Sequence, residues 1–162
     1  MNTPFLDSIY TRANFDRDLV FKFFTIFSLF EFALKKLGHR TKSGELKADW
    51  DDFARNIDNR FFPNSTTTIQ TSVDYLLNYP PKKQVLDPQG QMIFDDIHPN
   101  RNTNSENLSV YIRRVRNNLF HGGKFVYDFQ RDTELIKCSL IILEAWVQLD
   151  ANLQNELSNI TS

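Results

Sequence analysis

The segment from Leu19 to Leu34 constrains the fold more than any other part of this chain. Twelve of its sixteen residues are apolar, and the polar ones recur at every third position, as Lys22, Thr25, Ser28 and Glu31. Because three residues advance about 300° around an α-helix, these polar groups wind slowly across the helix surface. A membrane span needs about 20 consecutive apolar residues, so no span is expected. The pattern predicts a central helix, from about Phe15 to Leu37, that contacts partners on several sides.

Helical patterns also cover most of the remaining sequence. Apolar residues at helical spacing predict a helix from Trp50 that Pro63 ends, and a shorter helix from Thr67 to Tyr79. A fourth helix begins near Ser105, with a buried stripe of Leu108, Ile112, Val115 and Leu119. A fifth runs from about Asp132 to Leu157. Its near-heptad seam could pack against a neighbouring helix or another subunit, through Leu135, Ile142, Trp146, Leu149, Leu153 and Leu157.

The segment 80–104 breaks this helical pattern. It holds four of the six prolines and few long apolar runs, and it could include a short hairpin around Gln89-Gly90. A loop of this length is often functional. We therefore expect an all-α fold, with residues 1–162 forming a single domain. It would be a bundle of about five helices with a long irregular insertion, residues 80–104, before the fourth helix.

Composition limits the classes of function. The formal net charge is −1, which excludes a generally basic nucleic-acid-binding surface. A local basic patch is present, because Ser109 to Lys124 contains four Lys or Arg and no acidic residue. The single cysteine, Cys138, fits a reducing compartment. Met1 to Asp18 is polar and carries charges of both signs, unlike a secretory signal, so a cytoplasmic location is expected.

The residues most suited to chemistry lie in the stretch Arg116-Asn117-Asn118-Leu119-Phe120-His121-Gly122-Gly123-Lys124. Histidine can transfer a proton near neutral pH, and arginine can bind and stabilise a phosphorane with its planar fork. Asn117 can orient either partner by hydrogen bonding. Asn117 and His121 are four residues apart and share one helix face with Arg113, whereas Arg116 flanks that face by about 100°. Together these groups could cleave RNA by transesterification without a metal ion.

This stretch resembles the R-[polar]-x3-H motif of the HEPN superfamily of all-helical ribonucleases. Two further pieces are similar to members of that superfamily, Leu29 to Gly38 on the first helix and Arg131-Asp132 at the start of the last. The resemblance implies a HEPN-like helical bundle and an endoribonuclease that needs no cofactor. The products would be 2′,3′-cyclic phosphate and 5′-hydroxyl ends.

The resemblance also implies roles and partners. Arg116, Asn117 and His121 would be catalytic, Arg113 and Lys124 would bind the RNA backbone, and no residue would bind a metal. The active species would be a homodimer, in which the motifs of two protomers form one composite site. The expected setting is toxin–antitoxin or antiviral defence, with an antitoxin or another defence protein as partner. One departure is Gly123, which stands where toxins silenced by tyrosine modification carry a tyrosine.

Other interpretations of these residues stay open. His121 could simply cap the helix, and the fold could be a non-catalytic module that binds RNA or a protein through the same patch. Asp95, Asp96 and His98 could hold a metal, but a turn-rich acidic loop accounts for them more simply. Glu31 needs a partner on so apolar a helix, either as a structural contact, for example to an arginine of the fourth helix, or as a group supporting the site.

Overall fold

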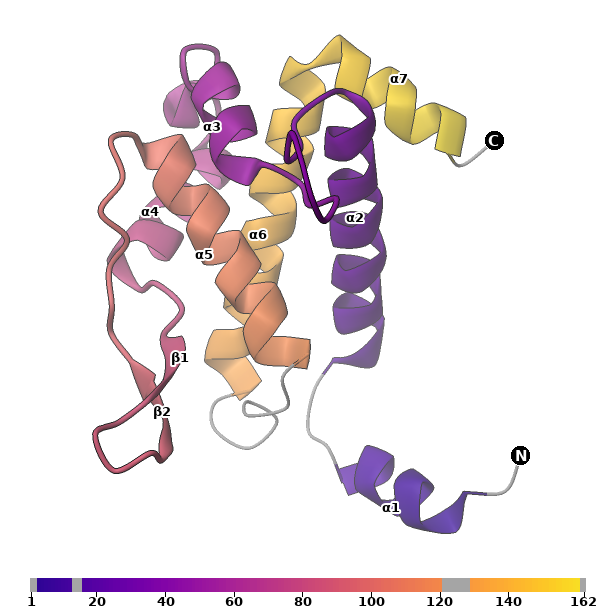
Figure 1. The fold of residues 1–162 in the computed structure, drawn as a ribbon, viewed down its shortest axis with the longest axis vertical. Coiled ribbons are helices and arrows are strands. Elements are labelled where there is room, and N and C mark those ends of the chain that lie inside the picture. Colours follow the sequence, from indigo (N-terminus) through magenta and orange to yellow (C-terminus); the bar gives the residue numbers. More distant parts are fainter. Residues whose placement is uncertain (1–2, 13–15, 121–128, 161–162) are drawn as a thin grey trace.

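The computed structural model describes residues 3–12, 16–120 and 129–160, and it is mainly helical (Figure 1). In chain order the elements of these ranges are α1 (Pro4–Arg12), α2 (Arg17–Lys36), α3 (Trp50–Asp58), a 3₁₀ turn (Pro63–Ser65), α4 (Thr67–Asn78), β1 (Lys83–Leu86), β2 (Met92–Asp95), α5 (Asn104–Phe120), α6 (Phe129–Leu149) and α7 (Ala151–Ile160). The mainly helical class predicted from the sequence is therefore confirmed.

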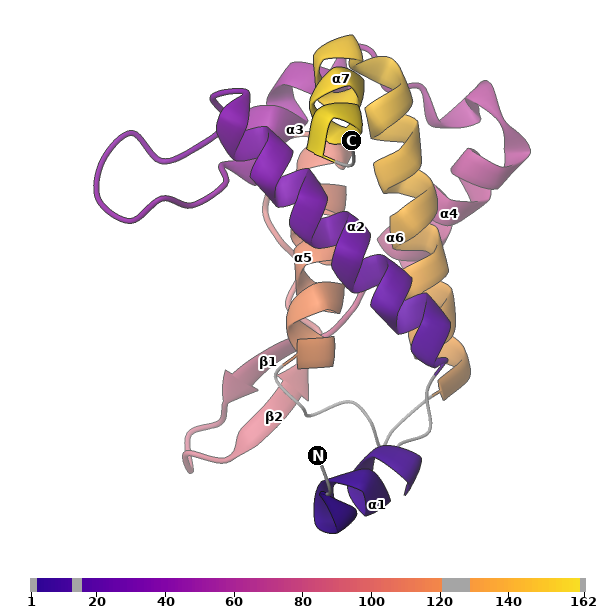
Figure 2. The ribbon, with the colours of Figure 1, turned by 90° about the vertical axis from the view of Figure 1, so that its right-hand side faces the viewer.

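Helix α6 lies at the centre of the packing, because α2, α4, α5 and α7 all contact it (Figures 1 and 2). Helix α2 contacts α6 and α7, but its Phe21 and Phe32 are exposed, so the central position predicted for this helix was wrong. Helix α5 packs against both α3 and α6. Stacked rings join α2 to α3, because the ring centroid of Trp50 lies 5.2 Å from those of both Phe27 and Phe30. Phe53 and Trp146 extend this cluster to α6. One buried aromatic core thus links helices that are far apart in the sequence.

Local signals place the ends of α2 and α5. The carboxylate of Asp16 accepts a hydrogen bond from the Leu19 N–H, and Gly38, at a φ of 96°, follows the end of α2. At the start of α5, the Thr103 Oγ1 accepts from the Glu106 N–H while the Glu106 Oε2 accepts from the Thr103 N–H. This reciprocal capping box fixes where the segment 80–104 ends and α5 begins.

The segment 80–104 contains regular structure that the sequence only suggested. Strands β1 and β2 pair in antiparallel fashion, with Lys83 opposite Asp95 and Leu86 opposite Met92. Gly90 lies in the turn with a φ of 77°, a left-handed conformation that glycine adopts without strain. The hairpin around Gln89-Gly90 is therefore confirmed, and the insertion is less irregular than expected.

Two further expectations about helices were wrong. The predicted helix from Asp132 to Leu157 is divided, because Asp150 ends α6 and caps α7 by accepting from the N–H groups of Asn152 and Leu153. The chain also forms α1, which the sequence interpretation did not include and which Figure 1 shows apart from the other helices. Of the proposed seam, Leu135, Ile142, Trp146 and Leu153 are buried within this chain. Over the described ranges, every helix is too short or too polar to cross a membrane.

Candidate functional site

Arg116 and Asn117 lie together on the last turn of α5. The Arg116 Nη1 donates a hydrogen bond to the Asn117 Oδ1 at 3.0 Å. The guanidinium also lies over two rings, 5.7 Å from the centroid of Phe27 and 5.5 Å from that of Phe120. Cation–π contacts of this kind hold the arginine beside α2 while Asn117 remains exposed. The aromatic rings of Phe27 and Phe120 therefore fix the position of this polar pair.

Two of the predicted site residues, His121 and Lys124, lie outside the described residues. His121 follows Phe120 directly in the sequence, and Phe120 is the last residue of α5. The placement of Arg116 and Asn117 therefore covers only the first part of the predicted motif.

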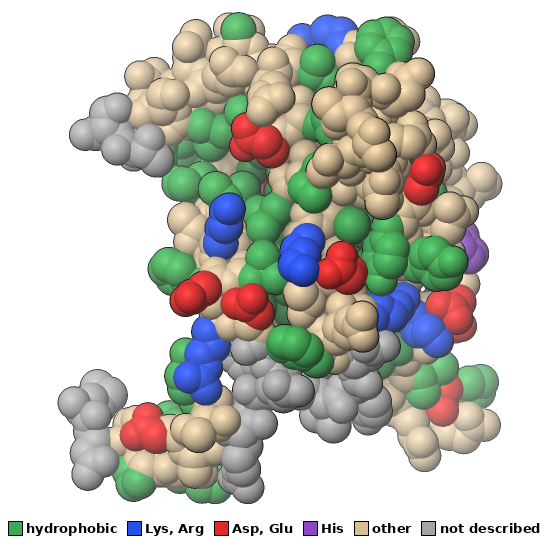
Figure 3. Space-filling model, turned by 180° about the vertical axis from the view of Figure 1, so that it is seen from behind, with side chains coloured by type: hydrophobic (Ala, Val, Ile, Leu, Met, Phe, Trp, Pro, Cys, Tyr) green, Lys and Arg blue, Asp and Glu red, His purple; other side chains and the backbone are tan. Residues whose placement is uncertain are grey.

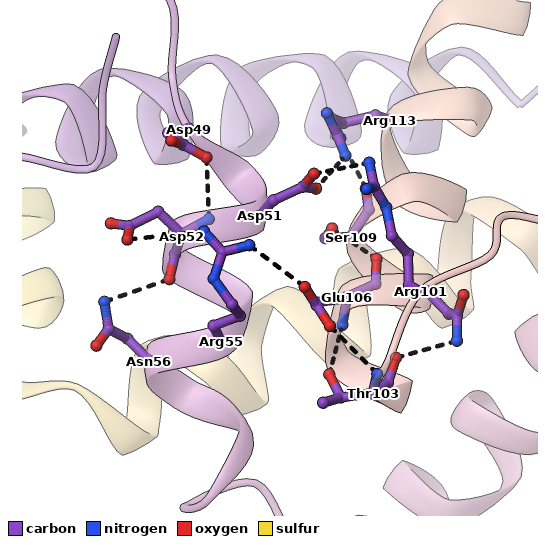
Figure 4. A network of polar contacts seen from close by, with 11 residues as sticks. Asp49, Asp51, Asp52, Arg55, Asn56, Arg101, Thr103, Glu106, Ser109 and Arg113 are labelled. Atoms are coloured by element: carbon purple, nitrogen blue, oxygen red, sulfur yellow. Dashed lines mark hydrogen bonds and ion pairs between the residues drawn. The ribbon is translucent and has the colours of Figure 1, made fainter. Parts of the chain in front are cut away.

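Arg113 makes contacts within the fold. Its Nη2 donates to the Asp51 Oδ1 at 3.0 Å and its Nε donates to the Ser109 carbonyl (Figure 4). Arg101 donates to the other oxygen of Asp51 at 2.7 Å. Burial lowers the pKa of Arg113, an effect that Asp51 and, more weakly, Glu31 oppose. The basic patch of α5 is thus partly neutralised by a carboxylate from α3, a contact between residues far apart in the sequence.

Glu31 makes a specific structural contact. Its Oε1 accepts a hydrogen bond at 2.8 Å from the Nε1–H of Trp50, whose residue is only 2% exposed. The sequence indicated that this carboxylate needs a partner, and its hydrogen-bond partner is the indole of Trp50, not an arginine of α5. Its negative charge also weakly favours the charged form of Arg113 on α5, by opposing the lowering of the Arg113 pKa.

A groove of about 460 Å³ opens beside Asn117, between α5 and the segment that leads from the hairpin. Its lining residues are mostly basic or amide-bearing, and none is acidic: Lys83, Ile97, His98, Pro99, Asn100, Arg101, Val110, Arg113, Arg114 and Asn117. On the face opposite to that of Figure 1, cations and carboxylates are mixed among hydrophobic side chains (Figure 3). The sequence interpretation missed Lys83, Asn100 and Arg101, which only the proximity of the insertion to α5 reveals, and it included Arg114 in the basic patch without naming it as a site residue.

Side chains of the helices fix the wall of this groove. The buried Asn118 donates its amide to the Lys82 carbonyl at 2.9 Å, and Arg131 donates to the Pro80 carbonyl at 2.8 Å. Arg114 donates to the Ile97 carbonyl on the far side of the hairpin. These bonds attach both ends of the hairpin to α5 and α6, so the groove is formed before any ligand binds.

The three side chains of the alternative metal site, Asp95, Asp96 and His98, each bind a different partner. Asp96 pairs with Lys82 at 3.2 Å, whereas the His98 Nδ1 lies 3.3 Å from the Tyr111 hydroxyl. Asp95 accepts a hydrogen bond from the backbone N–H of Asp96. Within the described ranges, no group of three or more His, Cys, Asp or Glu is arranged to hold a metal ion.

Comparisons with known proteins add no assignment to this geometry. The chain matches no protein-family model, no curated protein and no solved structure.

Proposed function

We propose that this protein is a metal-independent endoribonuclease of the HEPN type. The observation that carries the proposal is the hydrogen-bonded pair Arg116–Asn117 near the end of α5, with Asn117 four residues before His121 in the sequence and beside a cationic groove. Such an arrangement supplies fixed positive charge where a phosphorane would develop. It also lies next to a surface that can hold the adjoining phosphates.

The proposed reaction is transesterification. His121 takes the proton from the ribose 2′-hydroxyl, and the 2′-oxygen forms a bond to phosphorus. Arg116 binds the phosphorane oxygens, while Asn117 orients the guanidinium of Arg116. The bond from phosphorus to the 5′-oxygen then breaks, and a second imidazole donates a proton to that oxygen. The products are a 2′,3′-cyclic phosphate and a 5′-hydroxyl.

A homodimer would supply the second imidazole from the partner's copy of the motif. An exposed apolar surface next to Arg116 supports this part of the proposal. Phe21 is 70% exposed, and Phe24 and Phe120, whose ring centroids are 5.1 Å apart, are each partly exposed. Contiguous apolar groups on a surface often mark a contact with another protein. We further propose that the protein acts in the cytoplasm, in a toxin–antitoxin or antiviral defence system with a partner protein that restrains it.

A non-catalytic RNA-binding module is the second candidate. The observation that favours it is the cationic groove itself, which needs no histidine to bind a polyanion. The two functions differ at His121, whose loss abolishes cleavage under the first and leaves RNA affinity almost unchanged under both.

The test is RNA cleavage in excess EDTA by the wild type and by His121→Ala and Arg116→Ala. Lys47→Ala is the matched control, because Lys47 is an exposed cation that forms an ion pair with the nearby Glu45. Cleavage by the wild type and the control alone, with cyclic-phosphate ends, is the expected result. Equal cleavage by His121→Ala would show that the active site lies elsewhere. Loss of wild-type cleavage on adding EDTA would instead indicate a metal-dependent nuclease.

A further inference from the structure

The groove beside α5 holds an excess of positive charge. Four cations line it, Lys83 from β1, Arg101 from the segment after β2, and Arg113 and Arg114 from α5. The carboxylates beside them are Asp51, which Arg101 and Arg113 share, and Asp95, which is opposite Lys83 in the hairpin. Among the described residues, Lys83 and Arg114 form no ion pair, and Arg114 donates only to the uncharged carbonyl of Ile97. The groove therefore offers cations that the fold itself does not neutralise.

The environment of Arg114 supports this description. Partial burial lowers the pKa of its guanidinium, the neighbouring Arg113 lowers it further, and only Tyr111 opposes these effects. Tyr111 also lies beneath the guanidinium, with its ring centroid 5.7 Å away. An anion bound in the groove would stabilise the charged forms of both arginines.

The polar groups of the groove match a phosphodiester strand. Arginine forks bind phosphate oxygens in pairs, lysine binds them as a point charge, and amides bind ribose hydroxyls and phosphates. Asn117 belongs both to the groove and to the pair with Arg116. A strand lying along the groove would therefore end at the group proposed to orient the reaction.

We propose that this groove binds the backbone of single-stranded RNA next to the scissile phosphate, with Lys83, Arg101 and Arg114 contacting phosphates. The choice of RNA as the polyanion rests on the proposed function, whereas the site itself rests on the groove. The segment 80–104 is then the wall of the substrate-binding site, and the hairpin is held against α5 to keep that wall in place.

The experiment measures binding apart from cleavage. A short fluorescein-labelled single-stranded RNA is titrated by fluorescence anisotropy, in EDTA, with full-length His121→Ala protein as the reference. Lys83→Gln, Arg101→Gln and the double variant are made in that background, with Lys47→Gln as the control. Lys83 is exposed on β1, and Asp51 keeps Arg113 as a partner when Arg101 is replaced, so the variants should fold. Unchanged thermal midpoints verify this.

Each lost phosphate contact should reduce the slope of log affinity against log salt by about 0.7, the value for single strands. The affinity at a fixed moderate salt concentration should fall by roughly 3- to 10-fold for each single variant, and the effects should multiply in the double variant. The control should bind like the reference. If the double variant keeps the affinity and salt slope of the reference, or if the reference binds no RNA, the inference is overturned.

Competition identifies the ligand class. Adenosine 5′-monophosphate and poly-glutamate should displace the RNA only at concentrations far above that of unlabelled RNA. Equal competition by the mononucleotide would reassign the groove to a small phosphate ligand, and equal competition by poly-glutamate to an acidic protein. Failure of wild-type cleavage together with weaker binding by the groove variants would refute the proposed nuclease while keeping the groove. Normal cleavage by the wild type together with unaltered binding by the groove variants would keep the proposed nuclease and refute the groove as the RNA-binding site.

Discussion

Replacing Glu31 separates a structural carboxylate from one that serves the site. The Trp50 Nε1–H donates to Glu31 at 2.8 Å, and at 2% exposure the indole has almost no access to water. In Glu31→Ala this buried donor loses its acceptor. A hydrogen bond to a charged group contributes about 1.5–3 kcal/mol, and an unsatisfied buried donor costs about 1–3 kcal/mol. Since these two figures describe largely the same loss, we expect a destabilisation of about 2–3 kcal/mol.

Glu31→Gln keeps an amide oxygen that can accept the same hydrogen bond. It loses the negative charge and with it the favourable interaction with Arg113. We expect this variant to lose about 1 kcal/mol of stability, within the range for a neutral hydrogen bond. It should cleave RNA at the wild-type rate, because Glu31 supports the packing of Trp50 and takes no part in the proposed chemistry.

Urea unfolding followed by far-ultraviolet circular dichroism measures the free energies of unfolding. Glu134→Ala is the matched control, since Glu134 is a partly exposed glutamate on α6 that pairs with Lys137 one turn away. It should change the free energy of unfolding by no more than about 0.5 kcal/mol. A Glu31→Ala protein as stable as this control would refute the hydrogen-bond argument. A stable Glu31→Gln protein without cleavage would place Glu31 in the active site.

Two further predictions concern side chains that fix the frame. Asn118→Ala should lower the free energy of unfolding by about 1–2 kcal/mol, because it removes the buried bond to the Lys82 carbonyl, and hydrogen exchange should speed up in β1. Asp150→Ala should cost about 0.5–2 kcal/mol at neutral pH, since this carboxylate caps α7 and pairs with Arg60. Burial raises the pKa of Asp150, but the bonds from Leu153 and Arg60 outweigh it and leave that pKa lowered. The stabilisation is therefore present above the ordinary carboxyl pKa of about 3.9 and is lost as pH falls through the lower folded value. Unfolding curves of wild type and variant should converge in that acid range, and a constant difference down to the lowest pH would contradict the assignment.

Local chemistry accounts for the parts of the fold that could be predicted. The end of α2 before Gly38, the end of α4 before Pro80 and the turn at Gly90 all follow from residues that restrict or permit particular backbone conformations. The buried stripe of α5 follows from its apolar spacing.

The division at Asp150 was missed although its signal is in the sequence. The apolar spacing continues through Leu149 and Leu153, which suggested one uninterrupted helix. Asp150 followed by Asn152 and Leu153 is nevertheless a normal N-cap arrangement, and Arg60 binds both its carboxylate and the last carbonyl of α6. The capping residue Asp150 therefore ends the helix even though the apolar repeat continues past it.

The surroundings of the candidate site could not be predicted locally. Periodicity places Arg113 on the polar side of α5, and it lies there. Its guanidinium nevertheless binds the carboxylate of Asp51 on α3, which is 62 positions away in the chain. The groove is formed in the same way, because Lys83 and Arg101 reach α5 only through the folding of the insertion. The sequence identifies the cations, while tertiary packing decides which of them face solvent.

The anchoring of the hairpin has a practical consequence for spectroscopy. Its base is bonded to α5 and α6, while its turn is closed by its own Asp87, which accepts from the N–H groups of Gln89 and Gln91. Gln89 is exposed, and the only native thiol, that of Cys138, is buried. Gln89→Cys would therefore take a single fluorophore at the tip of the hairpin, whose Lys83 lines the groove. Such a label would report the arrival of a strand without occupying its path.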